Sequence, residues 1–257
     1  MRVLPIPVRE DNYAYLLIDN TSKKAAVVDP YSFDKVKAAA DQYGVQIVAV
    51  ITTHHHFDHS GGNEQFAKAF PDVPIYGGSD QVKAVTKLVK DKDEFTIGDS
   101  ITVKCLATPC HTQDSICYYV TDAKDSAQRG VFTGDTLFIA GCGRFFEGTG
   151  AEMHAALSYL GTLPDDTLVY NGHEYTASNV KFARSVDPAN SALSGLFGLL
   201  TETKMTTGLT TIKDEKLWNP FMRLSSEPIR KATKATEDAS LGAIMDELRN
   251  LKNNFKG

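Results

Sequence analysis

Short apolar runs separated by turn residues fill the first two-thirds of the chain. Two β-prone runs at residues 13–19 and 24–28 flank a polar turn, which predicts a hairpin. Residues 34–43 place Val36, Ala40 and Tyr43 at helical spacing, and Gly44 follows as a helix-ending residue. Beyond them we expect strands at 45–52, 74–77, 94–97, 100–107, 115–121, 129–133 and 168–170, and helices at 62–70 and 151–160.

The pattern changes near residue 176, where strand signals fade. Helical runs follow at 178–185, 190–203 and 241–255, and breakers such as Gly208 and Asn219-Pro220 separate them. We therefore predict an α/β catalytic domain at residues 1–172 and a small all-helical domain at residues 173–257.

Composition and charge narrow the classes of function. The chain has 257 residues, 42% of them hydrophobic and 23% charged, which is typical of a globular protein. Its net charge of −5 argues against a nucleic-acid partner. Residues 1–172 hold 15 Lys and Arg against 22 Asp and Glu, whereas residues 173–257 hold 12 against 10. The tail could therefore supply cations to an anionic small molecule, although chance unevenness explains the same numbers.

The absence of membrane-spanning, secretory and C-x-x-C signals predicts where the protein is located and the redox state of its cysteines. The apolar stretches, such as residues 47–51, are too short to span a bilayer, and no secretory signal is visible. We expect a cytoplasmic protein with no membrane partner. Its four cysteines contain no C-x-x-C pair, so we expect them to be reduced and buried.

A cluster of histidines directly follows the apolar run 47–51. The segment reads Thr52-Thr53-His54-His55-His56-Phe57-Asp58-His59, so three histidines and an aspartate stand at i, i+2, i+4 and i+5. Imidazole and carboxylate donors within one short turn form a ligand set that zinc and similar cations favour. The sequence therefore predicts a metal site at the end of this strand.

Three more ligand-type residues follow three other predicted strands. His111 comes after the strand ending near residue 107, Asp135 after the one ending near 132, and His173 after the one at 168–170. Seven donors are too many for one tetrahedral ion and suit two ions that share a bridging ligand. The full predicted set is His54, His56, Asp58, His59, His111, Asp135 and His173.

At this point the sequence resembles a known family. The HxHxDH loop with distal His, Asp and His is similar to the metallo-β-lactamase superfamily. The strings THHHFDHSGGN, TPCHTQDSICYY, FTGDTLFIAGCGRFFEG, NGHEYT and NPFMR resemble the hydroxyacylglutathione hydrolase (glyoxalase II) family over nearly the whole chain. This resemblance implies an αββα sandwich with a helical C-terminal domain.

The resemblance also implies roles for the ligands. It assigns His54, His56 and His111 to one divalent ion and Asp58, His59 and His173 to the other, with Asp135 bridging them. Zinc is the expected metal, with iron or manganese as alternatives. Asp58 and Asp135 would be catalytic, with Asp58 also able to shuttle a proton. Asp29 either orients a ligand histidine or makes a simple Asx-turn before Pro30.

The implied substrate is a glutathione thioester. The family hydrolyses S-(2-hydroxyacyl)glutathione, such as S-lactoylglutathione, to glutathione and a 2-hydroxy acid by attack of a metal-bound hydroxide, the second step of methylglyoxal detoxification. Positions that bind the glutathione part in relatives read Arg144, Phe146, Tyr175, Arg249 and Lys252 here. Relatives commonly carry lysine in place of Arg144 and tyrosine in place of Phe146. We expect a monomer.

Other functions remain open from the sequence. A persulfide dioxygenase of the same superfamily would use one iron on His54, His111 and Asp135. A scaffold protein with a degenerate site is not expected to carry all seven ligand residues. A β-lactamase or lactonase activity would not account for the helical tail. Metal content and thioester hydrolysis separate these possibilities.

Overall fold

The computed structural model describes all residues, 1–257, and they form two compact units. The first is Met1–Ala107 with Asp114–Gly134, and the second is Thr108–Gln113 with Asp135–Gly257. The predicted boundary between residues 172 and 173 stays a prediction, because units defined by packing need not follow a boundary defined by sequence. No helix combines the length and the apolar content that crossing a membrane takes.

A six-stranded sheet in the order β1-β2-β3-β4-β5-β6 forms one layer of the first unit. Strands β1 to β3 pair antiparallel and β3 to β6 pair parallel. The predicted hairpin is confirmed as β2 and β3, whereas β1, which contains two prolines, was not among the predicted strands. An edge strand tolerates proline, and β1 pairs only with β2. The strands are β1 (Arg2–Pro7), β2 (Tyr13–Ile18), β3 (Lys24–Val28), β4 (Gln46–Ile51), β5 (Ile75–Gly77) and β6 (Lys87–Leu88).

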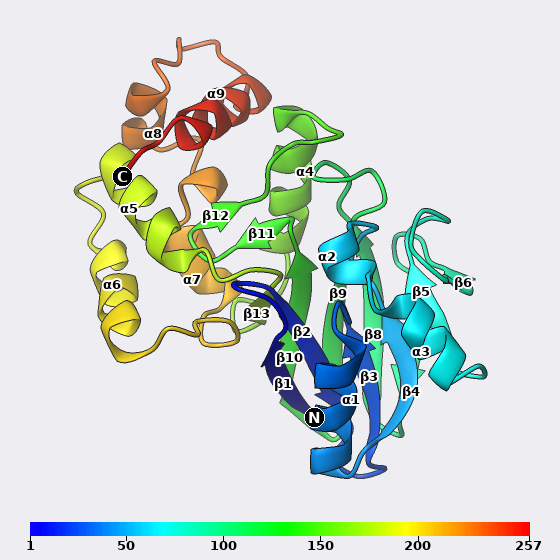
Figure 1. The fold of residues 1–257 in the computed structure, drawn as a ribbon. Helices are drawn as coiled ribbons and strands as arrows, with labels where there is room; N and C mark the ends of the chain where they lie inside the picture. The colour runs from blue at the N-terminus through cyan, green and yellow to red at the C-terminus, as the bar shows by residue number, and fades with distance from the viewer. The chain divides into compact units, whose positions relative to one another are not determined.

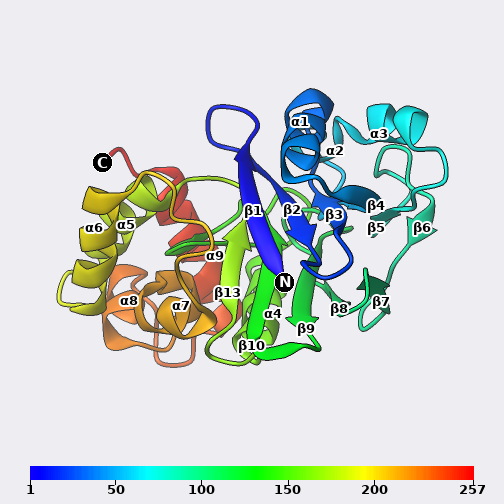
Figure 2. The same cartoon turned by 90° about the horizontal axis from the view of Figure 1, so that it is seen from below.

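Helices α1 (Phe33–Tyr43) and α3 (Asn63–Ala69) cover one face of this sheet (Figures 1 and 2). Val36 and Ala40 of α1 and Phe66 of α3 share one buried apolar cluster with the strands. The predicted helix stop is confirmed: Gly44 has φ +61° and its N–H caps two carbonyls of the last turn.

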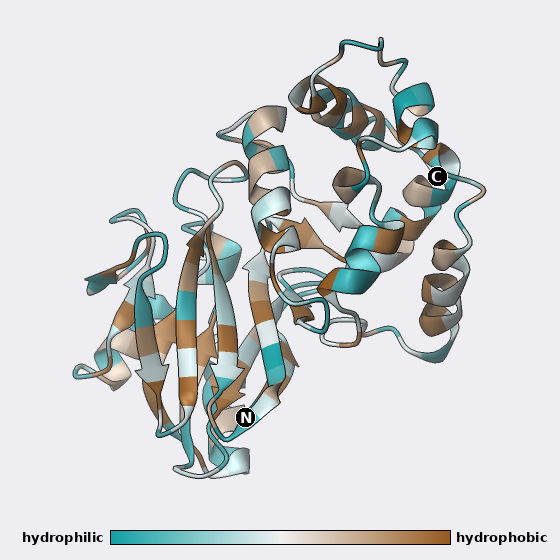
Figure 3. Ribbon diagram, turned by 180° about the vertical axis from the view of Figure 1, so that it is seen from behind, coloured by the Kyte–Doolittle hydropathy of each residue, from teal (hydrophilic) through white to brown (hydrophobic).

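The second layer of this unit is antiparallel, in the order β10-β9-β8-β7. Its strands alternate between hydrophobic and hydrophilic positions, as half-buried strands do (Figure 3). The ring of Tyr15 on β2 lies 5.2 Å from that of Phe132 on β10, and the Tyr118 hydroxyl donates to the Thr52 carbonyl at 2.9 Å. The core of the unit therefore lies between its two sheets. The strands are β7 (Glu94–Ile97), β8 (Ile101–Ala107), β9 (Ile116–Asp122) and β10 (Asp125–Gly134).

The second unit is mainly helical, and its tail helices are yellow to red in Figure 1. The helices expected near 151–160, 178–185, 190–203 and 241–255 are confirmed, whereas the short α7 and α8 were missed. Its elements are the hairpin β11 (Leu137–Phe138) and β12 (Gly141–Cys142), α4 (Gly150–Gly161), β13 (Leu168–Asn171), α5 (Thr176–Val186), α6 (Ala192–Glu202), α7 (Ile212–Trp218), the 3-10 helix η1 (Pro220–Met222), α8 (Glu227–Ala232) and α9 (Leu241–Asn253).

The cysteines have the state that the sequence predicts. All four are free and buried. Burial raises the pKa of Cys105, Cys110 and Cys142 to about 12, so these thiols stay protonated and unreactive near neutral pH.

Candidate functional site

The histidine loop of the first unit begins where β4 ends. Residues 52–56 leave the sheet, and the one-turn helix α2 (Phe57–Ser60) then presents Asp58 and His59. The loop lies close to the end of β10, because a Cβ at Gly134 would come 2.4 Å from the Thr53 hydroxyl oxygen. Gly134 also has φ +47°, so glycine suits this position on both counts.

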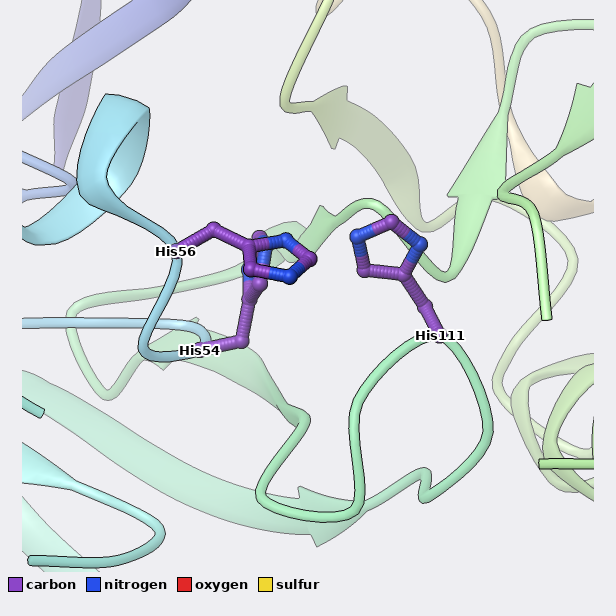
Figure 4. A group of neighbouring side chains, drawn as sticks. All are labelled: His54, His56 and His111. Carbon is purple, nitrogen blue, oxygen red and sulfur yellow. The ribbon is translucent and has the colours of Figure 1, made fainter. Parts of the chain in front are cut away.

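Hydrogen bonds fix which nitrogen of His54 carries the proton. The Thr53 hydroxyl donates to Asp29 Oδ2 at 2.7 Å, so its oxygen is left to accept from His54 Nδ1 at 3.1 Å. His54 Nε2 therefore keeps its lone pair. It faces His56 Nδ1 at 3.1 Å, and Figure 4 shows these two rings together on the loop after β4.

Asp29 lies behind the loop and is nearly inaccessible to solvent. Its Oδ1 accepts the Thr53 N–H at 2.7 Å, and its Oδ2 lies 2.9 Å from His59 Nδ1. A carboxylate only accepts, so His59 Nδ1 carries the proton and His59 Nε2 keeps its lone pair. Asp29 has φ +49°, a left-handed conformation that Asp and Asn adopt more readily than most residues.

Asp58 and His55 have partners of their own. Asn12 Nδ2 donates to Asp58 Oδ2 at 3.0 Å, and His59 Nε2 lies 3.8 Å from the same oxygen. His55 Nδ1 instead contacts Asp114 Oδ1 at 2.9 Å, and the other oxygen of Asp114 accepts from Ser79 at 2.9 Å.

In the second unit, His111, Asp135 and His173 lie together. Asp135 Oδ2 is 3.5 Å from His111 Nε2 and 3.4 Å from His173 Nε2. His111 Nδ1 donates to the Arg144 carbonyl at 2.9 Å, which leaves Nε2 as its unprotonated nitrogen. The His173 ring stacks on Tyr175, with centroids 4.9 Å apart and an interplanar angle of 8°.

The spacing of these donor atoms fits bound metal. Ligands at 2.0–2.1 Å from a tetrahedral ion are roughly 3.3 to 3.4 Å from one another. Within each unit, the pairs His54–His56, His111–Asp135 and His173–Asp135 have separations of 3.1, 3.5 and 3.4 Å. Neutral imidazoles with a fixed lone pair and ionised carboxylates are the donors such a site requires. The side chains of each unit therefore have the donor types and the spacing of metal ligands.

One pocket of the second unit gathers all five residues expected to bind glutathione. Arg144, Phe146, Tyr175, Arg249 and Lys252 line it together with His111 and Asp135. Phe255, near the end of the chain, also lines it, and the Lys252 ammonium lies 5.5 Å from the Phe182 centroid and 5.8 Å from that of Phe255.

The two cations of α9 differ in their surroundings. Arg249 is only 7% exposed and donates from Nη1 to the Cys142 carbonyl at 2.9 Å, a contact that helical spacing does not predict. Lys252 is half-buried and donates to the Ser178 carbonyl at 3.0 Å. Burial, together with the charge of Arg249, lowers the pKa of Lys252 to about 8.

Sequence reasoning missed several polar residues that hold the site. Asn12 contacts Asp58, Asp114 contacts His55, and the buried Glu215 and Asn219 bind the hairpin that follows Asp135. Asn219 belongs to the string NPFMR and was treated as a helix breaker. No local signal marks the other three residues, because their partners lie 46 to 75 positions away along the chain.

Known proteins resemble this chain over its whole length. A family model of the metallo-β-lactamase superfamily matches residues 8–173, and a model described as the C-terminus of hydroxyacylglutathione hydrolase matches residues 174–255. A probable hydroxyacylglutathione hydrolase of Schizosaccharomyces pombe is 47% identical, with 98% of each chain covered. The cytoplasmic hydroxyacylglutathione hydrolase of Arabidopsis thaliana is 42% identical, with 100% of each covered.

Among solved structures, ETHE1 from Myxococcus xanthus has a TM-score of 0.67 and 26% identity, covering 99% of this chain and 91% of that one. The predicted fold class, a metallo-β-lactamase fold followed by a helical domain, is confirmed by these matches. Full-length identity to the hydrolases is well above that to ETHE1. The chain belongs to the hydroxyacylglutathione hydrolase family of the metallo-β-lactamase superfamily.

Proposed function

We propose that this protein hydrolyses the thioester of S-(2-hydroxyacyl)glutathione, with S-lactoylglutathione as the representative substrate. The observation that supports it best is the pocket of the second unit, which two expected metal ligands and three cationic side chains line together. Glutathione carries two carboxylates, so such a pocket suits a substrate with an anionic handle beside its reacting bond.

The proposal includes two divalent ions, zinc foremost. His54, His56 and His111, drawn in Figure 4, would hold one ion; Asp58, His59 and His173 would hold the other. Asp135 would bridge the two, because its Oδ2 lies beside His111 Nε2 of one ligand set and His173 Nε2 of the other. When bound, such a pair of ions lowers the pKa of a shared water and polarises a carbonyl group.

The chain's own side chains have three tasks in this scheme. Asp29 and the Arg144 carbonyl keep His59 and His111 in the tautomer that ligates metal. Arg144, Lys252 and Tyr175 hold the glutathione part, whose contacts are the same before and during the reaction. No strong general acid is needed for the leaving group, because a free thiol has a pKa near ~8.5 and departs as the thiolate.

The test uses the full chain purified with its metal. We expect two metal ions per chain by mass spectrometry and release of thiol from S-lactoylglutathione. The lactoyl thioester of N-acetylcysteamine, which lacks both glutathione carboxylates, serves as the matched substrate and should show a much higher KM at similar kcat. One iron per chain without thiol release would overturn the proposal in favour of oxygen chemistry.

We further propose that the enzyme acts in the cytoplasm as a monomer. The Arabidopsis thaliana relative is named cytoplasmic, and the buried, protonated cysteines suit a reducing compartment. A fluorescent fusion and light scattering of the purified chain would check location and assembly.

A further inference from the structure

The hairpin β11–β12 is too small to hold its shape alone. Each strand has two residues, and the two strands pair only with each other. An isolated two-stranded ribbon is marginal in water. Its turn also places Ala140 at φ +55°, a conformation that a residue with a Cβ adopts only when its surroundings impose it.

Two fully buried side chains bind this turn: Glu215 in the middle of α7 and Asn219 directly after the helix. Asn219 Nδ2 donates to the carbonyls of Phe138 at 3.3 Å and Gly141 at 3.0 Å. Glu215 Oε2 accepts the Ala140 N–H at 2.9 Å, which holds the strained residue in place. Asn219 Nδ2 also donates to Glu215 Oε2 at 2.9 Å, so its two N–H groups are shared among three acceptors and the two side chains act on the hairpin as one group.

Other tail helices complete the enclosure of the hairpin. Asn179 on α5 donates to the Ile139 carbonyl at 3.1 Å, and Arg249 on α9 donates to the Cys142 carbonyl at 2.9 Å. Every residue from Phe138 to Cys142 thus has a backbone group bonded to a buried tail side chain. Such a complete enclosure fixes the hairpin far more tightly than its own two pairs could.

The hairpin stands between two parts of the site. It starts two residues after Asp135 and ends two residues before Arg144, whose carbonyl accepts from His111. The backbone after the hairpin passes close to the backbone before it: a Cβ on Gly143 would be 1.9 Å from the Asp135 carbonyl oxygen. Any movement of the hairpin would therefore move Asp135 and the carbonyl that orients His111.

We propose that Glu215 and Asn219 are positioning residues, through which the helical tail holds Asp135 and His111 in metal-binding geometry. This inference rests on the proposed function in taking Asp135 and His111 as metal ligands. It gives the tail a second task besides binding glutathione.

The test compares two tail variants of the full-length, zinc-loaded chain. Asn219→Ala removes the bonds to the hairpin. Asp187→Ala is the matched control: Asp187 is buried in the tail and pairs with Arg223 at 3.1 Å and Asn190 at 3.1 Å, and it bonds to no hairpin atom. Both should lower the melting temperature. Zinc release to a chromogenic chelator, measured well below both melting temperatures, should be at least tenfold faster in Asn219→Ala only, and its KM should rise severalfold.

A second variant guards against a failure to fold. Glu215→Gln keeps the size of the side chain but replaces one carboxylate oxygen by an NH2 group, which would face the N–H of Trp218 or of Ala140. This variant should release zinc faster in the same assay. If both hairpin variants released zinc at the wild-type rate and kept the wild-type KM, while losing stability as the control does, this inference alone would be overturned. A wild-type chain that neither holds metal nor cleaves the thioester would overturn the proposed function, and this inference with it.

Discussion

Replacing Asp29 by asparagine tests whether a buried carboxylate controls the metal affinity of the histidine loop. Asparagine adopts the left-handed conformation at φ +49° almost as readily as aspartate, so the change adds little backbone strain. It can still accept the Thr53 N–H with its one oxygen. Its amide nitrogen cannot accept from the Thr53 hydroxyl or from His59 Nδ1, which now contact Asp29 Oδ2 at 2.7 and 2.9 Å.

Two hydrogen bonds to a charged acceptor are therefore lost. Each is worth about 1.5–3 kcal/mol, and partial rearrangement leaves an expected loss of about 2–4 kcal/mol in the free energy of unfolding. The His59 ring should also change tautomer, so that Nδ1 accepts from the new amide and Nε2 gains the proton. Metal must then displace this proton, and affinity should fall by roughly 10–100-fold, as when other partners behind ligand histidines are removed.

Competition against a chromogenic chelator measures the metal affinity, and urea unfolding of the metal-free chain measures the stability. Asp114→Asn is the matched control, because Asp114 is as buried as Asp29 and holds His55 at 2.9 Å, a histidine outside the proposed ligand set. It should lose comparable stability and keep its metal affinity. Equal metal retention in the two variants would refute the argument about His59.

Four further predictions test other parts of the site. Asp135→Asn should lose both metal ions and reduce kcat by more than 100-fold, because an amide cannot bridge two cations; two ions per chain by mass spectrometry with near-normal turnover would contradict it. Lys252→Ala should raise the KM for S-lactoylglutathione roughly tenfold and change kcat only a few-fold, since this contact is the same in the ground and transition states. The wild-type KM should also rise with salt, and a lost kcat at unchanged KM would show that Lys252 acts on the chemistry. Phe146→Tyr, at a side chain that is 61% exposed, should lower the KM two- to tenfold through one added hydrogen bond, and an unchanged KM would exclude that contact. Burial raises the pKa of Glu215 to about 7, so the stability that its protonated form contributes is lost as pH rises through 7. Urea unfolding should show a decline on the order of 3 kcal/mol between pH 4.5 and pH 8 that Glu215→Gln removes; parallel pH profiles would contradict it.

The sequence alone determined the local parts of this protein. The HxHxDH loop directly follows a buried strand. Loop and strand are formed by adjacent residues, so the spacing of the histidines and the aspartate is enough to predict a set of metal ligands. His111, Asp135 and His173 each follow the end of a strand as predicted. The stop of α1 at Gly44 was predictable for the same reason, because a left-handed cap is a property of a few consecutive residues.

Only the tertiary structure decided what holds these residues. Asp29 contacts His59 across 30 positions, Glu215 reaches Ala140 across 75 and Arg249 reaches Cys142 across 107. Such contacts leave no periodicity in the sequence, since the chain path between the partners sets them. From helical spacing, Arg249 and Lys252 look like an equivalent exposed pair, yet packing buries Arg249 against the hairpin and leaves Lys252 half-buried at the pocket. Burial depends on which elements fold back over a helix, and that is a property of the whole fold rather than of the helix itself.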